Sequence, residues 1–582
     1  AWSGFRVAID GAPQIQVWPK FSAILSDVTL SKWTETEEPP VAEAERVEID
    51  LSALAALRGD VVFSAVRLIR PTVRAEPGAG GLLLPAAPTG GRIARAIDAA
   101  RAVVQAKPAD PDPAGLPSDE FGTVEFRDGR IVSMVNGAEA DVVTSLTGQA
   151  SWAALNAGAT LSATGIWHGE NVAVELSSAK PLLLFAGGTA PVSASLKAAP
   201  AVFSFTGNAS LANNTFVDGQ AKLTAPSLRR ALEWSGIGIA PGAAMGAVSV
   251  AAKVNAGAGR VKFEGAEITV DKNPGMGALD LSFTDALPMV SGTLAFETLD
   301  LRAFLSAFTP LAADGPVPNE IDTGFADRVK IDLRLSAAHA TAGSIQLSDV
   351  AATAQVKNGL AAFDISDAAA FGGNIQTGLR FDRRPEGTQV EMKLLASDIS
   401  GAAFGQATGM KRLMPTGTGT VSVILKGPGK AWDSVLENAD GSFSATFGAG
   451  NLAGFNLPAF LKHSEQGGFF ALDEVADGTL PIDGAELKAT ISRGVARLDK
   501  AEVRSGRTRI WLTGIVPYAG QGLALTGGVV QAQQPGAQPR QAQPDGQQAP
   551  PAAPAPPLAS FFVGGTWSTP FISPIGRRPS SD

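Results

Sequence analysis

Cysteine is absent from this chain of 582 residues, which also has only three histidines and one tyrosine. Without cysteine the chain can form no disulfide bridge, thiolate metal site, iron–sulfur cluster or cysteine nucleophile. His168, His339 and His463 lie far apart in the sequence, so no paired-histidine metal spacing exists. We therefore expect neither a metal site nor a cofactor.

The common signatures of catalysis are missing as well. No G-x-S-x-G motif occurs, and Gly429-Lys430 is followed by Ala431 where a phosphate-binding loop requires serine or threonine. The adjacent carboxylates Asp473 and Glu474 would point to opposite faces of a strand, which does not suit paired acid–base work. We assign no catalytic residue and expect that the protein is not an enzyme.

Charge and long apolar runs are also scarce. Charged residues make up 18% of the chain against a usual value of about 25%, and the net charge is −9 with no basic block. Nucleic acid is therefore not an expected partner. The densest apolar run, residues 181–188, is far shorter than the roughly 18 residues that read as a membrane-spanning helix. Because the chain starts with Ala1, we expect that a signal or membrane anchor preceded it.

What the sequence does contain is a strong alternation of apolar and polar residues. Residues 329–335 (VKIDLRL) alternate without interruption, and the same pattern recurs many times along the chain. A period of two predicts antiparallel strands with one apolar face. The alternation places the following residues on such a face: Val329, Ile331, Leu333, Leu335, Val390, Met392, Leu394, Val421, Val423, Leu425, Leu487 and Ile491.

Glycine and proline, with 65 and 39 residues, punctuate these strands. Residues 127–130 (RDGR), 357–359 (KNG) and 492–494 (SRG) predict hairpin turns, because each contains residues that tolerate positive φ. The apolar phase shifts near Ser348-Asp349, which predicts a β-bulge. Similar strand–turn–strand phrases return at irregular spacing, which indicates a repeated supersecondary unit rather than a short-period solenoid.

Helices and linkers are expected at a few places only. Periodicity predicts short helices at residues 92–107, 227–234, 300–308, 431–438 and 457–463. The predicted segments are a first strand region (1–75), a Pro/Gly-rich linker with a helical insert (76–118), central repeats (119–310), a C-terminal strand region (311–530), a disordered Gln/Pro-rich loop (531–557), and a final strand and tail (558–582). The expected fold class is therefore all-β with helical inserts.

A long one-sided sheet must cover its apolar face with a second sheet, with helices or with a ligand. The few short helices are not expected to suffice. Two interpretations remain, namely sheets packed on sheets and a concave sheet whose inner face holds lipid. Composition alone favours the sandwich, which is the commoner architecture.

The order of short phrases resembles the bacterial AsmA family over nearly the whole chain. The phrases are residues 4–10 (GFRVAID) and 17–19 (VWP) near the start, 181–184 (PLLL) and 203–207 (FSFTG) in the middle, and 417–420 (GTGT), 438–441 (NADG) and 563–567 (VGGTW) toward the end. The helical insert near 76–118 and the loop at 531–557 depart from the family pattern.

The resemblance implies an elongated, curved antiparallel sheet of repeated units that forms a hydrophobic groove. It further implies a protein on the periplasmic side of the Gram-negative inner membrane, anchored by an N-terminal helix that this chain lacks. Such proteins resemble bridge-like lipid transfer proteins and are linked with phospholipid transport and outer-membrane biogenesis. Phospholipids would be the partners, and the twelve alternating residues above would line the groove.

Two other hypotheses stay open. The protein could be an assembly factor whose sheet edge engages strands of outer-membrane proteins. It could also be a secreted β-solenoid adhesin or passenger domain, although the irregular repeat length, the nine tryptophans and the helical inserts argue against this.

Overall fold

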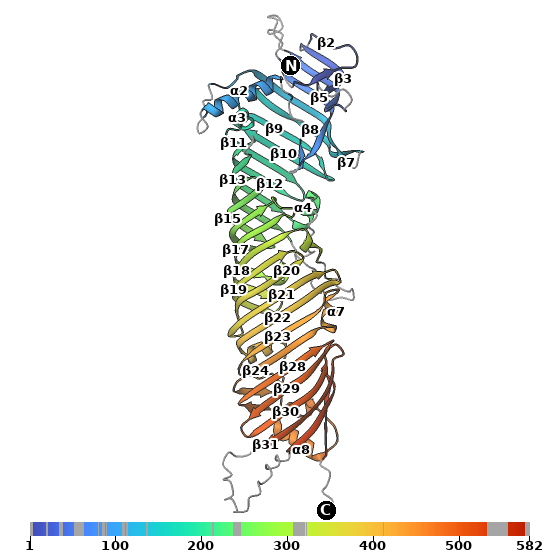
Figure 1. The fold of residues 1–582 in the computed structure, drawn as a ribbon, viewed down its shortest axis with the longest axis vertical. Coiled ribbons are helices and arrows are strands. Elements are labelled where there is room, and N and C mark those ends of the chain that lie inside the picture. The colour runs from blue at the N-terminus through green and yellow to red at the C-terminus, as the bar shows by residue number, and fades with distance from the viewer. Residues whose placement is uncertain are drawn as a thin grey trace, which may run out of the picture. The chain divides into compact units, whose positions relative to one another are not determined.

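The computed structural model has an all-β fold with 64% strand, 14% helix and seven short helices among the residues that it describes (Figure 1). These are residues 4–18, 21–33, 39–51, 63–78, 81–83, 88, 90–106, 111, 115–135, 138–211, 215–236, 246–306, 321, 323–410, 412–531 and 557–576. The main sheet is not closed. The predicted fold class is thus confirmed, whereas the loop predicted at 531–557 lies almost wholly outside the described residues.

The chain divides into two compact units. Unit 1 comprises residues 1–240 and 245–292, and unit 2 comprises residues 241–244 and 293–582. One strand, β17 (Met289–Asp300), contains residues of both units. The segment boundaries proposed from the sequence stay predictions.

Unit 1 is a sheet in which nearly every strand pairs with its neighbour in the chain. Its strands are β1 (Arg6–Ala8), β2 (Gln14–Gln16), β3 (Ser22–Ser31), β4 (Ala42–Leu51), β5 (Phe63–Gly78), β6 (Gly81–Leu83), β7 (Glu120–Val135), β8 (Ala138–Ala154), β9 (Ala159–Trp167), β10 (Glu170–Ser178), β11 (Ala190–Ala198), β12 (Val202–Ser210), β13 (Phe216–Ala225), β14 (Val248–Gly257), β15 (Arg260–Val270) and β16 (Asn273–Ser282). Its helices are α2 (Arg92–Ala106), α3 (Pro181–Ala186) and α4 (Leu228–Ser235).

The purely antiparallel sheet that we expected is wrong at one place in unit 1. Strands β5 and β7 pair in parallel, with Leu68 opposite Phe126, whereas the other pairings of the unit are antiparallel among the described strands. Parallel neighbours need a crossover of a dozen or more residues. The chain between them, which contains β6 and α2, supplies this crossover.

Unit 2 continues the same one-strand-at-a-time arrangement. Its helices are α5 (Leu301–Ser306), η2 (Gly324–Asp327), α6 (Gly401–Thr408), α7 (Trp432–Glu437), α8 (Leu457–Gln466) and η3 (Leu472–Val475). Its strands are β18 (Lys330–Ala342), β19 (Ile345–Lys357), β20 (Leu360–Ala370), β21 (Gly373–Arg384), β22 (Gly387–Ser400), β23 (Thr418–Pro428), β24 (Asp440–Phe447), β25 (Gly450–Ala453), β26 (Phe470–Ala471), β27 (Thr479–Ile482), β28 (Gly484–Ser492), β29 (Val495–Ser505), β30 (Thr508–Pro517), β31 (Gly522–Gln531), β32 (Ala559–Thr566) and β33 (Pro570–Pro574).

One insertion interrupts the regular order of unit 2. Strand β24 pairs with β28, so the chain from β25 to β27 leaves the sheet and returns to it. Within this insertion β25 and β27 pair with each other, and β26 pairs with β33, the last strand of the sheet. The insertion therefore reaches the C-terminal end of the sheet and places α8 there (Figure 1).

The local turn predictions have mixed outcomes. Asn358 and Gly359 have φ values of 52° and 76°, and Arg493 and Gly494 have 45° and 76°, as hairpin turns require. The predicted bulge is confirmed, since Asp349 has φ 53° and the register against β20 shifts there.

The hairpin predicted at residues 127–130 is wrong. Strand β7 runs straight through these residues, and Asp128, with φ 53°, marks a bulge instead. A Cβ at Gly129 would lie 2.9 Å from Pro71, so glycine is needed for the close approach of β5.

All five predicted helices are present, with α2, α4, α5, α7 and α8 at the expected places. The sequence reasoning missed α3 and α6. Helix α6 contains two glycines, which are poor helix formers. They are required by packing, because a Cβ at Gly401 or Gly405 would lie 1.9 Å from Pro415 O or 2.7 Å from Met410 O. The Ser400 side chain caps this helix by accepting the amide of Ala403.

Candidate functional site

The residue pairs across unit 2 form a continuous apolar ladder. Leu394 lies opposite Val423, and Val423 lies opposite Phe443. Residues directly opposite each other in a sheet share one face. The next rows follow the same rule, with Met392 opposite Leu425 and Ala445 opposite Leu487. The predicted residues of β22, β23 and β28 therefore lie on one face.

The ladder extends back to β18 through three intervening strands. Leu333 lies opposite Ala354, which lies opposite Phe363, and Leu379 then connects Phe363 to Met392. Across the same strands, the row of paired residues that starts at Ile331 ends at Val390, and the row that starts at Leu335 ends at Leu394. Val329, just before β18, is buried. The structure thus brings the predicted strand residues together on a single face of unit 2.

Part of this face borders a cavity of about 770 Å³. Four of the twelve predicted residues, Leu394, Val421, Val423 and Leu487, line it. The other eight do not line it, and six of these are buried, namely Val329, Ile331, Leu333, Leu335, Val390 and Ile491, whereas Met392 and Leu425 are half-buried. The wall of this cavity is almost entirely apolar, with Glu486 and Glu502 as its charged residues. The cavity volume falls in the 300–1,000 Å³ range of small-molecule sites.

Sequence reasoning missed much of the cavity wall. The wall also contains Phe443, Leu512, Leu525 and Val563 from later strands of the sheet. Phe443 alternates with Ser442 and Ser444, which is the same signal that identified Val423, so it could have been found. Val563 stands between Phe562 and Gly564 and gives no such signal. Phe460 of α8 also lines the cavity. Its place there depends on the insertion from β25 to β27, which no local sequence pattern predicts.

Short helices cover more of the apolar face than we expected. On α8 the ring of Phe460 lies 4.9 Å from that of Phe561 and 5.8 Å from that of Phe470, within a buried cluster that includes Val529 and Ile572. On α7 the ring of Trp432 lies 6.0 Å from that of Phe381.

On α6 the ring of Phe404 lies 5.4 Å from that of Phe371, and Phe404 also lines the cavity. Each of these three helices has only six to ten residues, so each can cover only part of the face. The cavity therefore has two kinds of wall, the strands of the sheet and the apolar side chains of α6 and α8.

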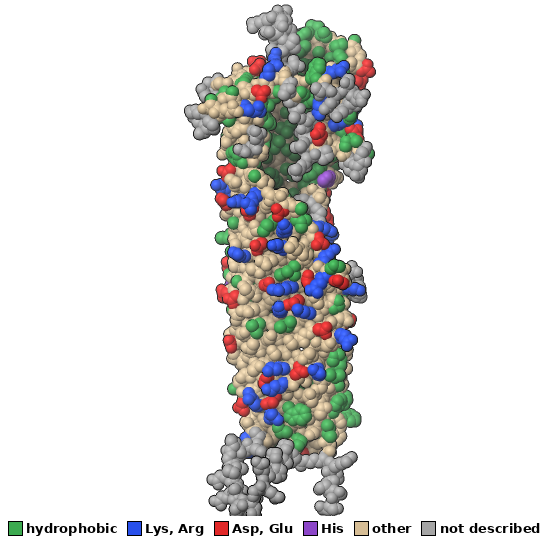
Figure 2. Space-filling view, viewed as in Figure 1, with side chains coloured by type: hydrophobic (Ala, Val, Ile, Leu, Met, Phe, Trp, Pro, Cys, Tyr) green, Lys and Arg blue, Asp and Glu red, His purple; other side chains and the backbone are tan. Residues whose placement is uncertain are grey.

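Unit 1 has an apolar cavity of its own, of about 570 Å³. Its wall comes from β3 to β11 and includes Leu68, Phe126, Leu161, Trp167 and Leu196. Figure 2 shows a hollow with hydrophobic side chains in this unit. None of the twelve predicted residues lies in unit 1, although Val47, Ile49 and Leu51 alternate with charged residues there.

A set of contacts beside this cavity, which we call the latch, holds α4 in place. Its residues are Trp167, His168, Glu170, Arg230 and Trp234. The ring of Trp167, a cavity residue, lies 4.7 Å from that of Trp234 in an edge-to-face arrangement. Trp234 Nε1 donates to Trp167 O over 3.0 Å, and His168 Nδ1 lies 2.6 Å from Trp234 O. An ion pair joins Arg230 to Glu170. Since α4 has no buried residue, these contacts at the β9–β10 turn hold it.

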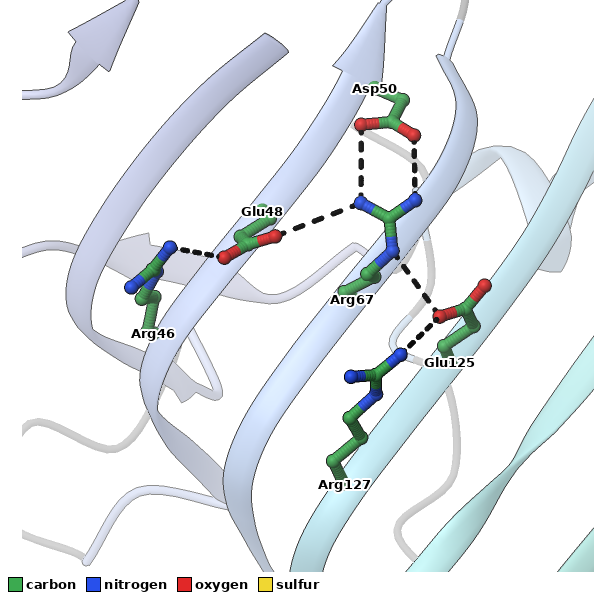
Figure 3. A network of polar contacts seen from close by, with 6 residues as sticks. All are labelled: Arg46, Glu48, Asp50, Arg67, Glu125 and Arg127. Carbon is green, nitrogen blue, oxygen red and sulfur yellow. Dashed lines mark hydrogen bonds and ion pairs between the residues drawn. The ribbon is translucent and has the colours of Figure 1, made fainter.

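In both units the face of the sheet opposite the apolar one carries charged side chains. In unit 1 the Arg67 guanidinium binds Asp50 over 2.9 Å and lies 3.2 Å from Glu125 and 3.7 Å from Glu48 (Figure 3). The hydrogen bond to Asp50 raises the pKa of Arg67. These contacts join β4, β5 and β7 and so reinforce the parallel pairing.

In unit 2 the ammonium groups of Lys500 and Lys488 lower the pKa of Glu486 to about 2. Lys393 and Lys426 likewise lower the pKa of Glu391. Such ion pairs lie in water, where each contributes little stability. They mark the solvated side of the sheet.

Asp473 and Glu474 lie in η3 and not on the strand that we expected, and these two residues and His463 make structural contacts. Asp473 pairs with Arg412, Glu474 accepts the Ala471 amide over 2.9 Å, and the His463 ring lies 5.0 Å from that of Phe470. Among the described residues no group of acidic or histidine side chains could hold a metal ion. In the same part of the chain, no helix has the length and apolar character to cross a bilayer.

Comparisons with family models, curated proteins and solved structures find no match to this chain.

Proposed function

We propose that this protein is an AsmA-like lipid carrier of the Gram-negative periplasm that holds phospholipid acyl chains against the apolar face of its sheet. In this proposal it is anchored in the inner membrane and supports lipid transport between the two membranes and hence outer-membrane biogenesis. Lipid moves along the sheet without covalent chemistry. The headgroups stay in water at the edge of the sheet.

The observation that carries the proposal is the largely apolar ladder from β18 to β28 with a cavity of about 770 Å³ on the same face. Each methylene group that leaves water contributes about 0.8 kcal/mol, so an acyl chain is held by its length rather than by polar contacts. A chain that slides along such a wall exchanges one apolar contact for another, which keeps the barrier to movement low. The phrase-by-phrase resemblance to the AsmA family favours the same function.

Mass spectrometry of the gently purified protein tests the proposal. We expect co-purified phospholipid in the wild type, and its loss when a charge enters the cavity wall. The decisive comparison uses Leu394→Asp, which alters the wall, and Leu395→Asp, which alters the opposite face. Wild-type protein without lipid, or equal lipid content in both variants, would contradict the proposal.

A further inference from the structure

At the C-terminal end of unit 2 the sheet is apolar on both faces. On one face, Phe561 and Val563 of β32 and Ile572 of β33 line the cavity. The residues between them in sequence, Phe562 and Phe571, point to the other face, because successive side chains of a strand alternate. Both are exposed, with 36% and 40% of their surfaces accessible.

These exposed rings belong to one patch. A Cβ at Gly564 would lie 2.7 Å from the ring of Phe571 and 2.8 Å from that of Phe562, so both rings lie over this glycine. The ring of Phe469 is 6.5 Å from that of Phe571 and is 81% exposed. We group these three rings with the exposed Trp567 and Ile575 of the same C-terminal segment and call the five residues, Phe469, Phe562, Trp567, Phe571 and Ile575, the terminal aromatic patch.

Charge is absent from the strands that carry Phe562 and Phe571. Residues 510–531 and 557–576 contain no Asp, Glu, Lys or Arg. The strands just before them carry ion pairs on the outer face, such as Lys488 with Glu486 at 2.9 Å and Arg509 with Glu502 at 3.7 Å. The neighbours of Phe562 across the sheet are Thr526 and Ser573, which are polar but uncharged. The outer face thus changes from charged to aromatic and hydroxyl-bearing.

One of the five residues, Trp567, also belongs to the cavity wall. This residue lies in the β32–β33 turn, lines the cavity and is still 53% exposed. Tryptophan and phenylalanine beside hydroxyl groups suit the interfacial zone of a bilayer, where one side is apolar and the other is wet. Strands β31 to β33 themselves carry no charge and so lose no ion hydration when they enter that zone, whereas η3 at this end carries charge, and Asp473 there pairs with Arg412.

We propose that the terminal aromatic patch docks unit 2 onto the interfacial zone of a phospholipid bilayer, with the outer face of the β32–β33 hairpin toward the lipid. This inference rests on the proposed lipid-binding function and adds the place where the cavity meets a membrane. An acyl chain then passes between the bilayer and the cavity wall beside Trp567 without crossing water. Because the patch carries no charge, its binding does not depend on anionic lipid or on low salt.

Flotation of the purified protein with phosphatidylcholine vesicles tests the docking. We expect the wild type to float equally well at low and high salt. Phe469→Ser, at a largely exposed position, is expected to weaken vesicle binding about ten-fold, or about 1.4 kcal/mol. The matched controls are Met276→Ser and Phe283→Ser, which remove exposed apolar side chains from unit 1 and are expected to bind like the wild type.

A second measurement follows Trp567 directly. We expect its fluorescence to be quenched by brominated lipid, and the quenching to disappear in Trp567→Phe. Unchanged flotation of Phe469→Ser, or wild-type flotation that salt abolishes, would overturn the docking. Loss of a dimer in Phe469→Ser without loss of flotation would also overturn it and would identify the patch as a contact between copies of this chain.

Lipid extraction from the same preparations separates the two proposals. Lipid retained in Phe469→Ser together with lost flotation supports both of them. Lipid present in a wild type that does not float overturns only the docking. A wild type that floats but contains no lipid contradicts the lipid-carrier function and leaves the vesicle measurements as the test of the patch.

Discussion

Leu394 and Leu395 are neighbours in β22, yet they face opposite sides of the sheet. Leu394 lies opposite Val423 and lines the cavity, whereas Leu395 lies opposite Ser422 and is 37% exposed. The two residues are chemically identical and share one backbone segment. They therefore offer a comparison in which only the face of the sheet changes.

The first prediction uses this pair. Leu394→Asp places an unpaired carboxylate in an apolar wall, and an unsatisfied polar group of this kind costs about 1–3 kcal/mol. We expect the phospholipid content to fall about ten-fold, which corresponds to about 1.4 kcal/mol. Leu395→Asp is expected to keep the wild-type content. Quantitative lipid mass spectrometry measures both, and circular dichroism checks that the two variants fold alike.

The second prediction concerns the helix at the end of unit 2. Phe460 is only 1% exposed and contacts three other phenylalanine rings. Removing such a ring costs about 3–5 kcal/mol, so Phe460→Ala is expected to lower the free energy of unfolding of unit 2 by that amount. Phe469→Ala, nine residues later but largely exposed, should change it by less than about 0.5 kcal/mol. Urea unfolding compares them, and equal effects would show that α8 does not pack as described.

The third prediction concerns the latch that holds α4. Trp234→Phe keeps an aromatic ring but removes the hydrogen bond from Nε1 to Trp167 O, which is worth about 1 kcal/mol. We expect amide hydrogen exchange in residues 228–235 to become about five-fold faster. Arg230→Ala breaks only an exposed ion pair and should have a smaller effect. Protection that stays the same in Trp234→Phe would contradict this account of the latch.

The fourth prediction is a pH dependence. The pKa of Glu486 is about 2 in the folded protein, below its usual value of 4.5, because Lys500 and Lys488 stabilise the carboxylate. A depressed folded pKa contributes stability above the unfolded pKa, and that contribution is lost as the pH falls from about 4.5 toward 2. Glu486→Gln should therefore lower Tm at pH 7 and have a much smaller effect at pH 2. High salt should reduce the difference, and thermal unfolding across this pH range measures it.

Local features of the fold followed from the sequence because their causes are local. The alternation through Ile331 and Leu333 specifies which side chains share a face once a strand forms, and Asn358-Gly359 specifies a turn because both residues adopt positive φ. The same reasoning failed at Asp128, where Gly129 serves a close approach to Pro71. That requirement arises from a partner strand more than fifty residues away in the sequence, so no local pattern can predict it.

The candidate site likewise has features that the sequence predicts and features that depend on the tertiary structure. The sequence by itself determined that one face of each strand is apolar and that the chain is rich in strands, since both follow from a period of two. Only the tertiary structure decided that Leu394, Val421, Val423 and Leu487 border a cavity while Ile331 and Val390 are buried elsewhere. It also decided that Phe460 forms part of that wall. Both outcomes depend on the register of many strand pairs and on an insertion that returns to the end of the sheet, and these are long-range contacts whose partners are set by the whole fold.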